Sequence, residues 1–197
     1  MIRRAVSAAL GLALAAGISL VAAAPAAAAY VEDDAYIGVR FPTANICVDD
    51  RTGSTWYYRV RDAVADFNSL PNVRMVRQVG RHACDSYPSE LILTWRNEGK
   101  TGWVGYARIY DDMTWGRTEH GNSTYVHGDV VIRLNAYYWQ SYDGWRHILT
   151  HEMGHALGLR HTQALTCASV MAQWPCTSYW LKLSAYDRAA LVRIYEQ

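Results

Sequence analysis

The sequence has no excess of either charge, because 19 lysines and arginines accompany 18 aspartates and glutamates, for a formal net charge of +1. Proteins that bind nucleic acids present a basic surface to the phosphates, and no basic cluster follows the first few residues here. We therefore expect no nucleic-acid partner. The chain also lacks repeats, low-complexity tracts and linkers, so residues 30–197 are expected to form one domain.

Cysteine is scarce, and no Cys-x-x-Cys pair occurs. This absence argues against a metal site built from cysteines. The four cysteines are expected to form disulfides, which persist in exported proteins, and four cysteines allow three connectivities. They are Cys47, Cys84, Cys167 and Cys176.

Long apolar runs are absent after residue 24, but one precedes it. A basic start at residues 1–4, an apolar middle from Ala5 to Ala24 and small residues at 25–29 are typical of a secretory signal peptide, assigned to residues 1–29. The alternative is an uncleaved membrane anchor, because the run is long. With cleavage, the remaining chain is expected to be secreted, extracellular, monomeric and free of the membrane.

The eleven residues from His151 to His161 read His-Glu-Met-Gly-His-Ala-Leu-Gly-Leu-Arg-His. On an α-helix His151 and His155 lie one turn apart on the same face, so both rings can bind one ion. Gly158 can end the helix and turn the chain back, which would bring His161 to that ion. Three imidazoles leave one position of a tetrahedral Zn²⁺ open, as in catalytic zinc sites. Glu152 could then act as a general base.

Other polar clusters are weaker candidates for metal sites. His120 and His127 could form a second site, but their spacing matches no dedicated motif. Two acidic pairs could bind Ca²⁺, although such pairs in turns are usually solvated; they are Asp49-Asp50 and Asp111-Asp112. One catalytic Zn²⁺ is the expected cofactor, and Ca²⁺ stays an alternative.

The motif His-Glu-x-x-His-x-x-Gly-x-x-His resembles the zinc signature of the metzincin metalloproteases. Those proteins carry a methionine-containing turn beneath the metal, and Ser169-Val170-Met171 stands where that turn would be. The alternative for Met171 is an ordinary core methionine. The run Leu183–Tyr195 is similar to matrixins, whereas the short methionine turn between two cysteines is similar to snapalysin, a small secreted protease. His161 differs from the aspartate typical of snapalysins at the third ligand.

The resemblance also implies a substrate cleft. In metzincins the fourth strand is an edge that lies antiparallel to the bound peptide. This would place four consecutive backbone units beside the substrate, namely Gly105, Tyr106, Ala107 and Arg108. Trp174 follows the methionine turn and is a candidate wall of the substrate pocket, with a buried structural tryptophan as the alternative.

The position of the methionine turn bears on the disulfides as well. A bridge between Cys167 and Cys176 would close the loop that carries Met171. Cys47 would then pair with Cys84.

Hydrophobic periodicity predicts five strands and three main helices. The expected strands are Ala35–Phe41, Asn72–Val79, Glu90–Trp95, Trp103–Tyr110 and Asp129–Asn135. The expected helices are Thr55–Phe67, a zinc-site helix with Asp143 as N-cap, and a helix starting at Ser184 with Asp187 in capping-box position. Combined with the resemblance, these elements give an α+β fold with a twisted, mixed five-stranded sheet.

Together these observations predict a secreted zinc metalloendopeptidase of the metzincin type that acts on protein or peptide substrates. Zinc held by His151, His155 and His161 would activate a water molecule, and Glu152 would move its proton. Two alternatives stay open: a non-catalytic zinc-binding interaction module, and a zinc hydrolase of a cell-wall amide. The intact Glu152 argues against the first.

Overall fold

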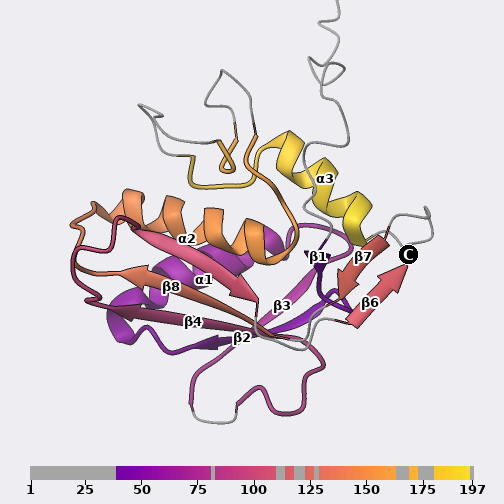
Figure 1. Cartoon of the computed structure of the whole chain (residues 1–197), viewed down its shortest axis with the longest axis horizontal. Coiled ribbons are helices and arrows are strands. Elements are labelled where there is room, and N and C mark those ends of the chain that lie inside the picture. The colour runs from indigo at the N-terminus through magenta and orange to yellow at the C-terminus, as the bar shows by residue number, and fades with distance from the viewer. Residues whose placement is uncertain are drawn as a thin grey trace, which may run out of the picture.

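The computed structural model describes residues 39–80, 83–109, 114–117, 123–126, 129–162, 169–172 and 180–195. Within these ranges a five-stranded sheet is combined with a small three-stranded sheet and three α-helices (Figure 1). The large sheet has the order β3 (Arg74–Gln78), β2 (Asn45–Asp50), β4 (Glu90–Arg96), β8 (Asp129–Asn135) and β5 (Gly105–Ile109). All neighbours are parallel except β5, which is antiparallel to β8. The predicted α+β fold with a mixed five-stranded sheet is confirmed.

One face of this sheet is apolar, because alternate residues along the central strands point to the same side. The buried residues on this face are Ile46, Val48, Leu91, Leu93, Val130, Ile132 and Leu134. Helices α1 (Tyr57–Phe67) and α2 (Tyr142–Ala156) cover this face (Figure 1). Helix α1 contributes Val60, Ala63, Val64 and Phe67 at helical spacing. The core therefore lies between the sheet and the two helices.

Helix α3 (Ala185–Tyr195) begins with the expected capping box. The backbone N–H of Asp187 donates to Ser184 Oγ at 3.2 Å, and the N–H of Ser184 donates to Asp187 Oδ2 at 2.8 Å. An ion pair between Arg188 and the buried Asp66 ties α3 to α1. The small sheet has the order β1 (Val39–Arg40), β7 (Ser123–Val126) and β6 (Thr114–Arg117), and it lies near the end of α3 (Figure 1).

The predicted first strand, Ala35–Phe41, is described from residue 39 onward, and there Val39–Arg40 forms a strand of the small sheet and not of the large one. The large sheet instead contains β2, residues 45–50, which the prediction missed. The preferred interpretation of Asp49-Asp50 as a solvated pair in a turn was also wrong, because both residues belong to β2. Both carboxylates are buried, and they pair with Arg51 and Arg77. Arg51 is adjacent in the sequence, whereas Arg77 is 27 residues away, so the pairing of Asp50 cannot be read from the local sequence. The pair Asp111-Asp112 lies outside the described residues.

The start of the zinc-site helix also differs by two residues from the prediction. Ser141, and not Asp143, is the N-cap of α2, and its Oγ accepts a hydrogen bond from the N–H of Gly144 at 3.0 Å. Asp143 lies in the first turn, where its negative charge complements the helix dipole.

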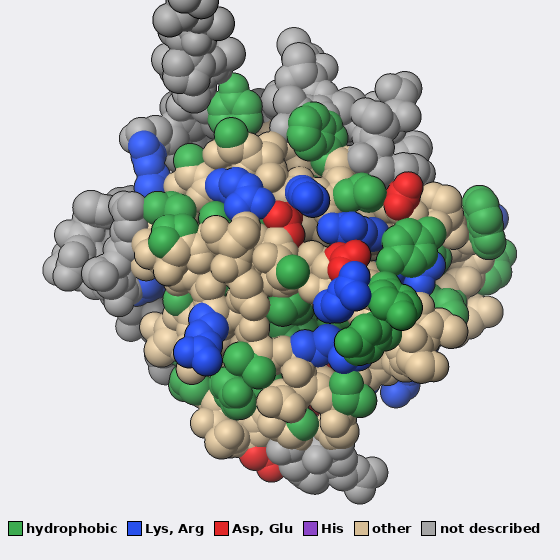
Figure 2. All heavy atoms as spheres, turned by 180° about the vertical axis from the view of Figure 1, so that it is seen from behind, with side chains coloured by type: hydrophobic (Ala, Val, Ile, Leu, Met, Phe, Trp, Pro, Cys, Tyr) green, Lys and Arg blue, Asp and Glu red, His purple; other side chains and the backbone are tan. Residues whose placement is uncertain are grey.

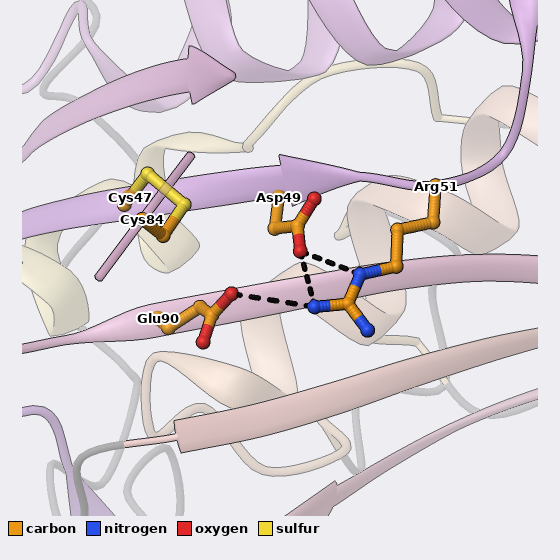
Figure 3. Close-up of a disulfide and its surroundings, with 5 residues drawn as sticks. All are labelled: Cys47, Asp49, Arg51, Cys84 and Glu90. Carbon is orange, nitrogen blue, oxygen red and sulfur yellow. Dashed lines mark hydrogen bonds and ion pairs between the residues drawn. A yellow bond between two sulfur atoms is a disulfide. The ribbon is translucent and has the colours of Figure 1, made fainter. Parts of the chain in front are cut away.

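The second face of the large sheet carries polar groups and a disulfide. Cys47 of β2 is bonded to Cys84, as one of the expected pairings required, whereas Cys167 and Cys176 lie outside the described residues. Beside this disulfide, Arg51 bridges Asp49 and Glu90 (Figure 3).

The molecular surface mixes charge types. Seen from behind, lysine and arginine side chains gather around a few carboxylates with hydrophobic groups beside them (Figure 2). Arg61 and Arg146, for example, both pair with Asp62 of α1. In the described part of the chain, none of the helices is long and apolar enough to cross a membrane.

Candidate active site

Helix α2 brings the first two motif histidines to one point, and the turn after it brings the third. The Nε2 atoms of His151 and His155 are 3.1 Å apart. The Nε2 atom of His161 lies 3.0 Å from that of His151 and 3.1 Å from that of His155. Gly158 has φ 106°, a left-handed conformation that ends the helix and turns the chain toward His161. Among the described residues this is the one cluster of three metal-ligating side chains.

The backbone around these rings orients their lone pairs. Nδ1 of His151 lies 2.8 Å from the carbonyl oxygen of Val170, and Nδ1 of His155 lies 2.8 Å from that of Leu159. A carbonyl only accepts hydrogen bonds, so each Nδ1 carries the proton and each Nε2 offers a lone pair to a metal. A tetrahedral zinc with Zn–N bonds of about 2.0–2.1 Å would separate its ligand nitrogens by about 3.3 Å. The donor set therefore fits Zn²⁺.

Partial desolvation favours the neutral form of these histidines, which is the form that binds a metal. Desolvation, followed by repulsion from His155, lowers the pKa of His151 to about 3, although the hydrogen bond to Val170 opposes the shift. Desolvation is also the main cause that lowers the pKa values of His155 and His161. The lowered pKa values favour the neutral imidazoles that can bind a metal.

Glu152 lies between α2 and the edge strand β5. Its side chain is buried, and this burial raises its pKa to about 7, while a hydrogen bond from the backbone of Ala107 acts in the opposite direction. Gly105 approaches this carboxylate closely, since a Cβ at that position would lie 2.8 Å from Ile148 Cγ2 and 3.2 Å from Glu152 Oε1. The close approach of β5 to α2 thus requires glycine at position 105.

The four predicted cleft residues on β5 do not share one orientation. Gly105 and Ala107 lie on the helix side, near Glu152. Tyr106 is paired in register with Arg133, and its side chain points to the opposite face of the sheet from Gly105 and Ala107. Its ring packs against that of Trp103, with centroids 4.6 Å apart. β5 is an edge of the large sheet, so its backbone, and not the side chain of Tyr106, is what lies beside the site.

Met171 is fully buried beneath the zinc-site helix. A Cβ on Gly154 would lie 2.4 Å from Met171 Sδ, so the sulfur occupies the space that a side chain at position 154 would need. The turn is joined to the segment after His161, because the N–H of Thr162 donates to the Met171 carbonyl at 2.9 Å. The turn carrying Met171 and the third histidine therefore form one connected unit.

Asp187 is a supporting residue whose wider role sequence reasoning missed. Besides capping α3, its carboxylate accepts hydrogen bonds from Ser169 Oγ at 2.6 Å and from the N–H of Val170 at 3.2 Å. The carbonyl of the same Val170 lies against Nδ1 of His151. This buried carboxylate thus holds the turn that orients a histidine. The capping-box spacing was the signal available in the sequence, but it identifies only the local partner.

Trp174, His120 and His127 lie outside the described residues. A further histidine of α2, His147, lies one turn before His151; its Nδ1 is 2.8 Å from the carbonyl oxygen of Trp180, and it is not a member of the three-histidine cluster.

Comparison with known proteins agrees with this geometry. The family model described as matrixin, Peptidase M10, matches residues 88–196, more than half of the 197 residues. The chain therefore belongs to the matrixin family, and it is a zinc metalloendopeptidase. No significant match is found among curated proteins.

Solved structures provide a comparison of the fold. Myroilysin matches with a TM-score of 0.52 at 11% identity, over 83% of this chain and 98% of that chain. High choriolytic enzyme 1, a hatching enzyme zinc-protease from the medaka fish Oryzias latipes, gives a TM-score of 0.47 at 12% identity, over 85% of this chain and 96% of that chain. At such low identity, the likeness to myroilysin shows a shared fold.

Proposed function

We propose that this chain is exported through a signal peptide at residues 1–29 and cleaves peptide bonds of proteins outside the cell. His151, His155 and His161 are the zinc ligands in this proposal, and Glu152 is the general base. The observation that carries it is the convergence of three Nε2 atoms within 3.1 Å of one another, beside a buried carboxylate and a sheet edge. The Cys47–Cys84 disulfide supports export, because disulfides persist in oxidising compartments.

The chemistry divides between the metal and the protein. When bound, zinc polarises the scissile carbonyl and lowers the pKa of a water molecule to about 7. Glu152 accepts the proton that the attacking water releases and then donates it to the nitrogen of the leaving amine. Burial raises the pKa of this carboxyl group above its ordinary value, which favours its return to the protonated form before it donates to the leaving amine.

The edge strand β5 supplies the binding surface in this proposal. Strand addition would pair the outward backbone groups of β5 with an extended peptide, and Ala107 would at the same time hold the Glu152 carboxylate toward the scissile bond. Met171 supports the floor of the site. Such pairing uses backbone groups of the substrate, so it favours polypeptides over a cell-wall amide.

The test is hydrolysis of casein and of a short quenched-fluorescence peptide, with and without a zinc chelator, by wild type and by Glu152→Gln. The variant is expected to lose activity by about 10²- to 10⁴-fold, the usual contribution of a general base, while retaining one zinc by mass spectrometry. Glu90→Gln, on the far side of the sheet, is the matched control and should keep full activity on the short peptide.

The other outcomes separate the alternatives. Activity of Glu152→Gln within tenfold of wild type would contradict its role as base. Bound zinc without hydrolysis of any substrate would favour an interaction module. Hydrolysis of purified cell-wall polymer without cleavage of protein would favour an amide hydrolase.

A further inference from the structure

A cavity of about 290 Å³ lies on the face of the large sheet that α1 and α2 leave uncovered. Its floor is formed by Ile92 of β4 and Val131 of β8, which are paired in register. The neighbours of these residues along each strand, such as Leu91 and Leu93, point into the core on the opposite side. The cavity is therefore separated from the histidine cluster by the sheet itself.

Three arginines line this cavity, and two of them have no anionic partner within the described ranges. Arg51 pairs with Asp49 and Glu90. Arg96 of β4 and Arg133 of β8 form no ion pair with another described residue. A guanidinium group binds carboxylates through paired N–H donors. Two guanidinium groups that form no ion pair with a described residue, beside an apolar floor, therefore suit a ligand with carboxylates and an aliphatic part.

Two carboxylates, Glu98 and Asp129, also line the cavity. They reduce the positive charge of the cavity and disfavour the binding of polyanions such as nucleic acids, which carry a phosphate at every nucleotide. Asp129 lies four residues before Arg133 on the same strand, at a distance of roughly 13 Å along it, whereas Glu98 follows Arg96 by two residues, so single carboxylates alternate with the arginines along the cavity. A ligand with a few spaced carboxylates matches this distribution better than a dense polyanion.

The position of the cavity connects it with the edge strand. Arg133 is paired in register with Tyr106 of β5, and the adjacent Gly105 and Ala107 lie on the Glu152 side of that strand. Neighbouring strands are about 4.8 Å apart, so the cavity between β4 and β8 begins within one or two strand spacings of the edge. A polypeptide bound along β5 can therefore pass around this edge and reach the cavity with roughly six to ten extended residues.

We propose that this cavity is an exosite for an acidic segment of the protein substrate, with its carboxylates on Arg96 and Arg133 and its aliphatic groups on Ile92 and Val131. This inference rests on the proposed peptidase function, because it assigns a substrate class to that enzyme. Glutamate-containing segments, located about six to ten residues from the scissile bond, are the expected occupants.

The test uses quenched-fluorescence peptides that share one cleavable sequence. They carry a tail of glutamates and leucines, or a matched tail in which glutamine replaces glutamate, attached on either side through a flexible linker. For the wild type, the glutamate tail on one side is expected to lower KM by roughly three- to tenfold with kcat unchanged, as expected for two charged contacts at a partly exposed surface. The advantage should shrink as ionic strength rises.

The variant Arg96→Gln with Arg133→Gln should abolish the advantage of the glutamate tail and leave hydrolysis of the untailed peptide unchanged. The matched control is Arg61→Gln with Arg74→Gln, which removes two exposed arginines that do not line the cavity and should retain the advantage. Equal KM values for both tails on the wild type, or an advantage that survives in the cavity variant, would overturn the proposal.

A binding measurement distinguishes failure of the exosite from failure of the peptidase. Fluorescence anisotropy of a labelled glutamate tail that lacks the cleavable sequence should show binding to wild type and roughly three- to tenfold weaker binding to the cavity variant. Binding without any peptidase activity would refute the proposed function but keep the site. Peptidase activity without tail binding would refute the exosite alone.

Discussion

The two faces of the large sheet have different roles, although the same strands form both. On the helix-covered face, side chains such as Leu91 and Ile132 are fully buried, and the core supports α2 with its histidines. On the other face the alternate residues include Glu90, Arg133 and the bonded Cys47. One strand can serve both because its side chains alternate between the faces.

The two faces differ in how closely their atoms pack and therefore in how well they tolerate substitution. On the helix side, atoms meet so closely that glycine is required at positions 105 and 154. On the other face, the contacts are ion pairs made by long side chains such as Arg51, which contacts the carboxylates of Asp49 and Glu90 (Figure 3). We therefore expect changes on the helix side to affect zinc and catalysis, and changes on the other side to affect the free energy of unfolding or distant substrate contacts.

Removal of the disulfide on the uncovered face should give the largest loss of stability. Cys47→Ala with Cys84→Ala opens a loop with a sequence separation of 37 residues, which in the chain-entropy account lowers the free energy of unfolding by about 3–4 kcal/mol. Urea denaturation would measure this loss, and kcat of the folded fraction should equal that of the wild type. A change in kcat at full zinc occupancy would contradict the expectation that the uncovered face affects stability and not catalysis.

Asp187→Ala tests whether support of the methionine turn reaches the histidines. Loss of this buried acceptor leaves Ser169 and the N–H of Val170 without their partner, which should cost about 2–3 kcal/mol. Because Val170 also orients His151, zinc affinity should fall by about 10- to 100-fold in a competition assay with a chelating dye. Arg188→Ala, which breaks a neighbouring ion pair on α3, is the control, and its zinc affinity should stay unchanged.

Gly154→Ala compares two glycines of the same helix. The new Cβ would collide with Met171 Sδ, so we expect a loss of about 1–3 kcal/mol from overpacking, together with weaker zinc binding. Gly144→Ala, at the first turn of α2, would place its Cβ 3.1 Å from Gln140 Oε1 and 3.2 Å from Ser141 Oγ, which are milder contacts, and should change stability by less than about 1 kcal/mol. Equal melting temperatures for the two variants would show that the contact with Met171 is not restrictive.

The pH dependence of Glu152 gives the most specific effect. In the zinc-free protein its pKa is raised from 4.5 to about 7, so the folded state binds more protons than the unfolded state between these values. The contribution of this group is therefore most favourable below pH 4.5 and declines as pH rises through 7. Glu152→Gln lacks this dependence and should gain on the order of 1–3 kcal/mol over the wild type between pH 5 and 8.

The histidines do not obscure this comparison, because their lowered pKa values contribute equally to both proteins. Denaturation of zinc-free samples at several pH values provides the measurement. A stability difference that is independent of pH would mean that the Glu152 carboxyl group is not desolvated in the folded protein.

Sequence patterns identified most of the fold, and the exceptions have a common cause. The segment Glu90–Arg96 was recognisable because its apolar residues alternate and mark one buried face. Strand β2 was missed because Asp49 and Asp50 interrupt that pattern, and their neutralisation by Arg51 and Arg77 is visible only after folding. The start of α2 was placed two residues late, since Ser141 and Asp143 are both suitable caps by composition.

The sequence by itself determined the zinc-binding unit, from His151 to His161, because helical periodicity and the glycine at 158 fix the relative positions of nearby residues. The tertiary structure decided which distant groups complete that unit, namely the Asp187 carboxylate, the Val170 carbonyl and the close approach of Gly105 to Glu152. It also decided that Arg96 and Arg133 share one cavity. Contacts between segments far apart in the chain depend on packing, and no local spacing records them.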